Sequence, residues 1–350
     1  MQAFSATQAL SPAIERTKSL LFQPFRWGTY LKLCAVAVFT EELGGNFNSN
    51  FSSSHQHADL GAASVPIHFS PILVAVLVLA AIVAIALGIA IFYLAVRLRF
   101  ALFECLIRQS RLIRPGWHGY RGPANRFFLL CLVVGLVFCA VAVAVLAPFL
   151  LGIWSLVHAY QTSGQVALGG VLALVLPLIP IFLLLVLAAI AADILLRDFM
   201  LPHMALENAT AGQAWAAVRT RIACEKGDFL LYAVLRVILP VVAVIGLFIV
   251  LIIPGILVFG SLGVLMGVVH AIFSGATGAG LLVRVLLEAV LGLAILALAL
   301  FLAISVGGPL CIAIRNYALV FYGGRYRALG DILSPPPPLP PAPATQPGIA

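Results

Sequence analysis

Several runs of more than 18 residues without a charged side chain constrain this sequence more than any other feature. As a helix, a run of that length can cross a hydrocarbon layer about 30 Å thick. Only 9% of the 350 residues are charged and 63% are hydrophobic, whereas soluble domains are about one quarter charged. The alternating strands of a membrane barrel are not found in the sequence. The sequence therefore predicts an all-α polytopic transmembrane helical bundle.

Six spans are expected, and the first of them is the least regular. Only eight residues separate Lys32 from Glu41, so this segment crosses only if Lys32 reaches one surface and Glu41 and Glu42 reach the other. The apolar run 255–271 is expected to be re-entrant or interfacial, because a seventh crossing would place the C-terminal arginines outside. The six expected spans are 24–42, 72–96, 127–154, 171–196, 229–253 and 282–306.

The cations alternate along the chain, which has a formal net charge of +8. Seven arginines lie in 97–126, whereas 43–71, 155–170 and 254–280 contain no lysine or arginine. By the positive-inside rule, both termini and the basic connections are expected in the cytoplasm. The positive charge is interpreted as a topology signal and a surface for anionic lipid headgroups, not as a nucleic-acid site.

Residues 1–333 are expected to form a single transmembrane domain, followed by a proline-rich tail at 334–350. The tail cannot form a helix or strand, so we expect a disordered or extended cytoplasmic segment. An extended proline-rich segment can bind an aromatic groove on a protein partner. The cytoplasmic face and the tail are therefore the two places where a protein partner is expected.

Three cytoplasmic interfacial helices are expected beside the spans. In 97–111 the charged residues at 97, 104, 108 and 111 share one helical face and the phenylalanines lie away from it, which is typical of an amphipathic helix. Thr210 and Gln213 have the spacing of a capping box and predict the start of another helix. Ser11 followed by Pro12 predicts a third start, with Ser11 as the N-cap.

A repeat of about one hundred residues is indicated by two similar segments. Arg16-Thr17-Lys18 matches Arg219-Thr220-Arg221, and each motif is followed by a phenylalanine with a cation seven residues later, Lys32 or Arg236. A related similarity joins LRDFML at 196–201 to IRNYAL at 314–319. These matches predict parallel repeats of an interfacial helix and two spans, up to three times.

The stretches SPAIERTKSLLFQPFRWGTYLKL and LRDFMLPHMALENATAGQAWAAVRTRI, with FLLYAVLR after them, resemble an uncharacterised family of prokaryotic polytopic membrane proteins. That family is similar in layout to the membrane domain attached to some bacterial glycerophosphodiester phosphodiesterases. The resemblance covers most of residues 5–330. It implies a multi-pass helical bundle in the bacterial cytoplasmic membrane, and it implies no established activity.

Ionisable residues within spans are the candidate binding residues, because they are costly in a membrane. A cytoplasm-facing cavity that binds an anionic headgroup or solute would be lined by Lys32, Asp193 and Arg236, with Arg197 paired to Asp193 at helical spacing. The alternative is that Lys32 and Arg236 extend to the interface. Arg284 and Glu288 are expected to form a structural pair.

The sequence offers no catalytic constellation, no metal-ligand motif and no cofactor motif. The first function class is therefore a non-enzymatic adaptor, assembly or regulatory membrane module. The second is a transporter or flippase-like protein for a small anionic solute or lipid. A membrane enzyme is the third. A polar cavity at the membrane midplane would favour transport, and an apolar interior would favour the adaptor.

Overall fold

The computed structural model describes residues 4–45, 71–163, 168–275 and 277–334, and all regular secondary structure in these ranges is helical. The all-α prediction is therefore confirmed. The α-helices are α1 Leu10–Phe22, α2 Trp27–Gly45, α3 Pro71–Ile107, α4 Ile113–Gly119, α5 Arg121–Ser163, α6 Leu168–Ile194, α7 Leu201–Leu206, α8 Ala211–Cys224, α9 Lys226–Ile272, α10 Ala279–Leu302, α11 Gly308–Gly323 and α12 Arg327–Leu333, with π-helical segments η1 Leu195–Met200 and η2 Ala303–Gly307.

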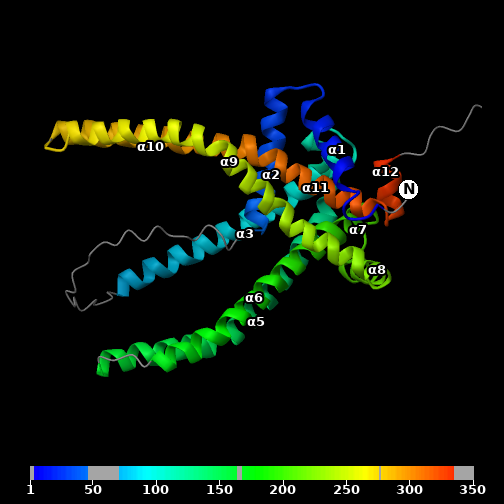
Figure 1. Ribbon diagram of the computed structural model, residues 1–350, viewed down its shortest axis with the longest axis horizontal. Coiled ribbons are helices and arrows are strands. Elements are labelled where there is room, and N and C mark those ends of the chain that lie inside the picture. The colour runs from blue at the N-terminus through cyan, green and yellow to red at the C-terminus, as the bar shows by residue number, and fades with distance from the viewer. Residues whose placement is uncertain (1–3, 46–70, 164–167, 276, 335–350) are drawn as a thin grey trace, which may run out of the picture.

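Long helices project from a group of short helices, as Figure 1 shows. We call the short helices α1, α4, α7, α8, α11 and α12, with the last turns of α3, the hub. We call the projecting parts of α3, of the α5/α6 pair and of the α9/α10 pair the arms. Helices α5 and α6 pack against each other, as do α9 and α10.

Five helical segments are long and apolar enough to cross a membrane. They contain the five later expected spans, whereas the first expected span, 24–42, is not among them. That region forms α2, which has Lys32 and Glu41 within its 19 residues. Figure 1 shows α2 running across the direction of the arms. The five segments are Val74–Ile107, Arg121–Thr162, Gly169–Leu206, Lys226–Ile272 and Ala279–Gly323.

The apolar run 255–271 is part of α9 and not a separate re-entrant element. Helix α9 has 47 residues, so it is about 70 Å long at about 1.5 Å per residue. A hydrocarbon layer of about 30 Å cannot contain that length. Part of α9 must therefore extend beyond this layer. Pro240 and Pro254 lie inside this helix, where each removes one backbone hydrogen bond.

The central stretches of the arms are apolar around their whole circumference. In each of the five candidate spans, the most apolar 18-residue window has no buried residue. Leu184 on α6 is 68% exposed, and Val250 on α9 is 70% exposed. A helix that is apolar on every side requires lipid or other helices around it. The arms therefore present a large surface for the membrane or for partner helices.

The hub has a well-packed core centred on α11. All ten residues from Ile314 to Gly323 are buried, which is the expected state of a helix surrounded by others. The Tyr232 ring of α9 stacks on Phe321 at 4.4 Å between centroids and on Tyr317 at 5.2 Å. Aromatic stacking contributes beyond the burial of area alone. Helix α11 thus joins the base of the α9 arm to the hub.

The expected amphipathic helix over 97–111 is instead the last part of α3, which ends at Ile107. Nine consecutive residues, Arg99 to Ile107, are buried. Gly116 on α4 packs against this stretch, because a Cβ at that position would lie 2.8 Å from the Ala101 Cα. Of the periodic charges in this segment, Glu104 is therefore buried in the hub, whereas the Arg108 side chain stays 67% exposed.

The capping prediction is confirmed at the start of α8 and is wrong at the start of α1. The Thr210 side chain accepts from the Gln213 N–H at 3.4 Å, and the Gln213 side chain accepts from the Thr210 N–H at 2.9 Å. Ser11 is not an N-cap, since α1 begins at Leu10. Ser5 and Gln8 instead form reciprocal bonds of 3.2 and 3.3 Å one turn earlier. The sequence signal for the start of this helical region is thus the S-x-x-Q spacing of Ser5 and Gln8.

Replacing Thr210 by alanine is expected to lower the free energy of unfolding by about 1 kcal/mol, because the Gln213 N–H at the start of α8 loses its acceptor, the Thr210 hydroxyl. Denaturant titration in mild detergent measures this change. Thr220→Ala is the matched control, since exposed Thr220 donates only to the Ala216 carbonyl within the same helix. Equal losses for both variants would show that the cap contributes nothing.

Candidate functional site

Seven charged side chains from six helical segments meet where the arms join the hub. We call them the charge cluster. Asp198 and Arg197 are the most enclosed, with side chains 1% and 3% exposed. Burial of charge is costly unless each group is paired, so this concentration requires a specific set of contacts. The members are Glu41 of α2, Arg99 of α3, Asp193 of α6, Arg197 and Asp198 of η1, Arg236 of α9 and Arg315 of α11.

Asp198 is the central acceptor of the cluster. It accepts hydrogen bonds from the Tyr232 hydroxyl at 2.8 Å, from Arg236 Nε at 3.2 Å and from Arg315 NH1 at 3.0 Å. The donors come from α9 and α11, while Asp198 lies on η1. One carboxylate therefore connects three parts of the chain that are far apart in sequence.

Glu41 connects the end of α2 to the same arginines. Its carboxylate accepts from Arg315 Nε and lies 3.5 Å from Arg197 NH1 and 3.8 Å from Arg236 NH2. The sequence prediction set Glu41 and Glu42 at the surface opposite Lys32 and did not foresee these contacts. The three arginines compensate a carboxylate whose side chain is only 17% exposed, and they hold Glu41 at the junction.

The remaining contacts involve Arg99, Asp193 and Arg197. Arg197 Nε pairs with Asp193 one helical turn earlier. Arg99 donates through Nε and NH2 to the Thr40 carbonyl oxygen, at 3.2 Å in both cases. Arg197 and Asp198 are consecutive, and both enter the cluster from the π-helical segment η1. Local π-helical turns are often found at functional sites.

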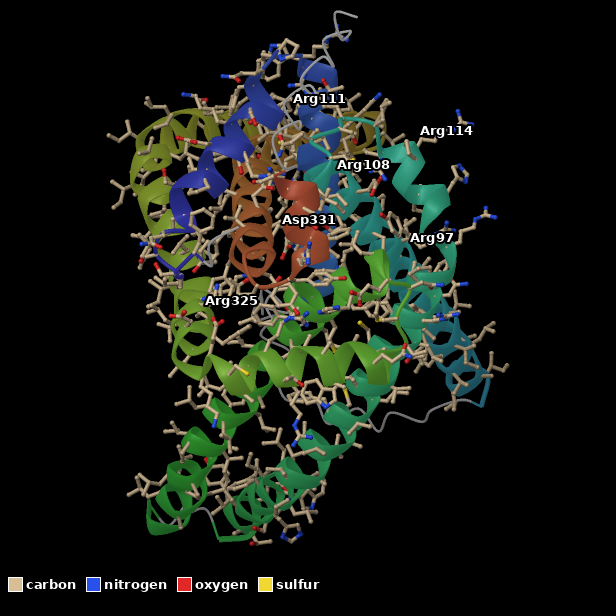
Figure 2. The ribbon with its side chains drawn as sticks, turned by 90° about the vertical axis from the view of Figure 1, so that its right-hand side faces the viewer. Arg97, Arg108, Arg111, Arg114, Arg325 and Asp331 are labelled. Atoms are coloured by element: carbon tan, nitrogen blue, oxygen red, sulfur yellow. The ribbon has the colours of Figure 1, made fainter. Side chains whose placement is uncertain are left out.

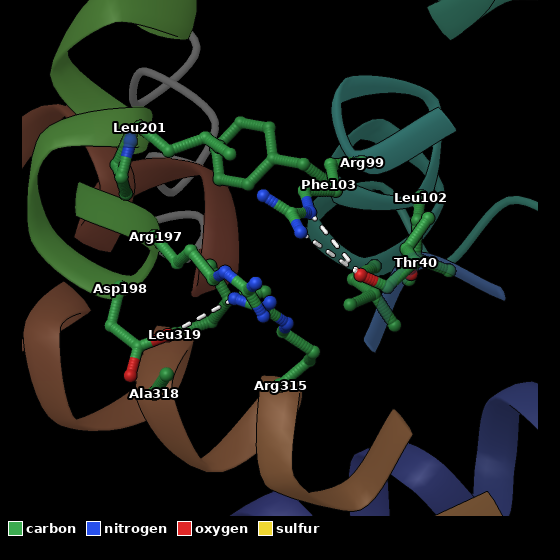
Figure 3. A pocket seen from close by; sticks show the side chains of 12 residues that line it. Thr40, Arg99, Leu102, Phe103, Arg197, Asp198, Leu201, Arg315, Ala318 and Leu319 are labelled. Carbon is green, nitrogen blue, oxygen red and sulfur yellow. Dashed lines mark hydrogen bonds and ion pairs between the residues drawn. The ribbon is translucent and has the colours of Figure 1, made fainter. Parts of the chain in front are cut away.

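A small cavity of about 30 Å³ lies within the cluster. Figure 3 shows the guanidinium groups of Arg99, Arg197 and Arg315 converging on it from three segments of the chain. NH2 of Arg197 and NH2 of Arg315 are buried without a hydrogen-bond partner among the described atoms. The other walls are largely aliphatic and aromatic, and include Leu102, Phe103 and Leu319.

Three of the four candidate residues from the sequence meet in this cluster. Asp193, Arg197 and Arg236 belong to it, whereas Lys32 is exposed on α2 and joins no ion pair among the described residues. The sequence prediction missed Glu41, Arg99, Asp198 and Arg315 as members of the site. The similarity between 196–201 and 314–319 contained a signal for one of them, because it aligns the predicted Arg197 with Arg315. The proposed binding role of the candidates stays a prediction.

The structural pair Arg284 and Glu288 is confirmed, with Nε to Oε1 at 2.9 Å. Glu288 also lies 3.1 Å from His270 Nδ1, so the group joins α10 to the far end of α9. It is well separated along the arm from the charge cluster. Its contacts satisfy the charges without a cavity, which supports a structural role.

Several arginines of the basic connections bond to helix carbonyl groups in the hub. Arg16 donates to the Leu333 and Leu106 carbonyls at 3.1 Å each, and burial lowers the pKa of its guanidinium. Arg111 donates to the Leu20 carbonyl at 2.9 Å. Cations at helix C-termini stabilise unpaired carbonyls. Part of the positive charge thus serves the fold, while the Arg108 side chain remains 67% exposed on the hub face in Figure 2.

Lys32 and Arg236 should respond differently to replacement by leucine. Arg236→Leu is expected to lower the free energy of unfolding by about 3 kcal/mol or more, because Asp198 and Glu41 lose a buried partner. Lys32→Leu should stay within about 0.5 kcal/mol of the original protein, since its side chain is exposed. Parallel denaturant titrations compare them, and equal losses would contradict the arrangement.

Five long apolar helical segments that project from a buried charge cluster indicate a helical multi-pass membrane protein. The model of a family of unknown function (DUF7544) matches residues 4–332, so the chain belongs to that family. Comparison with curated proteins and with solved structures gives no match. No activity is known for the family, so any proposal about function rests on the geometry of the protein.

Proposed function

We propose that this protein is a non-enzymatic membrane module that acts as an adaptor, assembly factor or regulator. One observation carries the proposal: polar groups concentrate at the hub and its junction with the arms, while the arms, apart from the group of His270, Arg284 and Glu288, are apolar and exposed. Membrane helices associate through packing, and close approach needs accessible surface on both partners. The arms offer this surface, and the hub holds their bases in place.

The orientation is part of the proposal. The hub lies at the cytoplasmic face of a bacterial inner membrane, with both termini in the cytoplasm and an even number of crossings. The arginine-rich connections support this, because they belong to the hub and not to the arms (Figure 2). Exposed Arg108 and Arg114 would contact anionic lipid headgroups there. The tail 334–350, which lies outside the described residues except for Ser334, would bind a protein partner.

A parallel three-fold repeat is also proposed. Its support is that α3, the α6–η1 segment and α11 each supply one buried arginine to the cluster, namely Arg99, Arg197 and Arg315. Short helices α1, α4 and α8 precede the three long segments in the same order. Under this proposal α1, α4 and α8 are the interfacial helices.

A lipid transporter or flippase-like protein is the second candidate, favoured by an apolar groove of about 1080 Å³ between α2, α9 and α10. The groove borders the charge cluster. Cys311 lines the groove, and Arg315 lies four residues later on the same face of that helix. Val38 also lines the groove, and Glu41 lies three residues later on the same face of α2. An apolar channel that ends at charges has the form of an amphiphile site.

Site-specific photo-crosslinking in intact membranes tests the adaptor proposal. A cross-linker at Leu184, on the exposed arm surface, should capture one membrane protein in stoichiometric amount. The matched control is Leu329, which is fully buried in the hub and should capture nothing. If Leu184 captures only lipid, and the purified protein moves fluorescent anionic lipid across liposomes, the transporter replaces the adaptor.

A further inference from the structure

Charge balance at the cluster is incomplete among the described side chains. Four arginines face three carboxylates, which leaves one net positive charge. Arg99, Arg197 and Arg315 are at most 9% exposed, so water screens this charge poorly. An uncompensated buried charge is strongly unfavourable. The site therefore calls for one additional negative charge.

Hydrogen bonding points to the same place. NH2 of Arg197 and NH2 of Arg315 are enclosed and have no acceptor within the part of the chain that the structure describes, although the other groups of both side chains are paired. A buried charged donor without an acceptor loses its hydration without replacement. Both side chains line the cavity, together with Arg99, as Figure 3 shows. Two unpartnered donors and the surplus charge thus share one small space.

The size of the cavity selects the ligand. A volume of about 30 Å³ accommodates one or two water-sized particles, since one water requires about 10–15 Å³ on this measure. A phosphate or carboxylate ligand has several heavy atoms and would have to displace Leu102, Phe103 or Leu319. Water fits and offers lone pairs, but it brings no charge. A halide fits, accepts from both guanidinium groups and neutralises the surplus.

We propose that the cavity between Arg99, Arg197 and Arg315 is a binding site for a single halide-sized anion, such as chloride. The bound anion completes the contacts that join α3, η1 and α11. Anion binding thereby stabilises the junction of the arms with the hub. This site does not depend on whether the protein acts as an adaptor or as a transporter.

Thermal unfolding of the full chain in phosphatidylcholine nanodiscs tests the proposal. Chloride or bromide replaces gluconate at constant ionic strength, so that screening does not change. The expected result is a saturable rise of the unfolding midpoint with either halide, because a ligand that binds only the folded state stabilises it. An equal midpoint in all three salts would overturn the proposal and assign the cavity to water. Stabilisation by anionic lipid alone would overturn it as well.

Two variants should shift the halide affinity in opposite directions. Arg99→Gln removes the surplus charge, and the dissociation constant for bromide should rise about tenfold or more. Asp193→Asn removes a negative charge at a side chain that is 37% exposed, which increases the net positive charge of the cluster. This variant should lower the dissociation constant for bromide. Asp331→Asn, at an exposed position of α12, is the control and should leave the constant unchanged. If Arg99→Gln does not fold, an unchanged constant in Asp193→Asn still refutes the site.

Discussion

Replacing Asp198 by asparagine is expected to lower the free energy of unfolding by about 3–5 kcal/mol, the typical result of removing one partner from a buried ion pair. The carboxylate is 1% exposed and accepts from Tyr232, Arg236 and Arg315. Asparagine keeps the shape and one acceptor, but it removes the charge that compensates two arginines. The junction of η1, α9 and α11 should loosen, and denaturant titration in mild detergent should show the loss.

Asp331→Asn is the matched control for this prediction. Asp331 also faces an arginine, but its side chain is 65% exposed and lies 3.8 Å from Arg327 Nε. An exposed pair of this kind contributes about 0–1 kcal/mol. Similar small losses at positions 198 and 331 would mean that the cluster does not stabilise the hub.

Replacing Gly308 by leucine should lower the free energy of unfolding by at least about 3 kcal/mol, through a steric mechanism. A Cβ on Gly308 would lie 2.7 Å from the Cys34 Cα and 2.2 Å from its Cβ. A backbone atom cannot move aside as a flexible side chain can, so α2 and α11 would have to separate. Because Glu41 lies on α2 and Arg315 on α11, their ion pair would be disrupted too.

Gly292→Leu gives the comparison, because a Cβ at Gly292 would meet nothing within 4 Å. Leucine is a better helix former than glycine, so this variant should unfold at an equal or slightly higher denaturant concentration. Thermal and chemical unfolding of both variants, prepared identically, provide the test. A tolerated leucine at position 308 would mean that α2 and α11 do not approach this closely.

The long helices could be predicted from sequence because hydropathy alone determines them. The runs 72–96, 127–154, 171–196, 229–253 and 282–306 each lie within a long apolar helical segment. Segment 24–42 could not be judged in this way, since its outcome depends on a partner for Glu41. Three arginines supply that partner, and they come from positions more than 150 residues later. Such long-range pairing is not encoded in local hydropathy.

The cluster was accessible to sequence reasoning only in part. Asp193 and Arg197 are one turn apart on a helix, so their pairing followed from spacing. Glu104 was assigned to a polar face because charges recur at 97, 104, 108 and 111, but the packing of α3 in the hub buries it. Local periodicity shows which residues share a face and cannot show what covers that face.

The division between hub and arms suggests how the protein could act. A junction held by charged contacts fixes the bases of the arms, while apolar arms can adapt to lipid or to partner helices. If the proposed anion site is correct, the stability of this junction depends on a ligand from solution. Binding would then change how firmly the arms are held.

A double-mutant cycle between Glu41 and Arg315 tests most directly whether the end of α2 is held in the buried cluster. The variants are Glu41→Gln, Arg315→Gln and the pair combined, with unfolding free energies measured in the same detergent. Contact of the two side chains predicts a coupling energy of about 1–3 kcal/mol, so the double variant should lose less than the two single losses combined. Lys32→Gln with Arg315→Gln should be additive. Additive losses for Glu41 and Arg315 would contradict the cluster and place the end of α2 elsewhere.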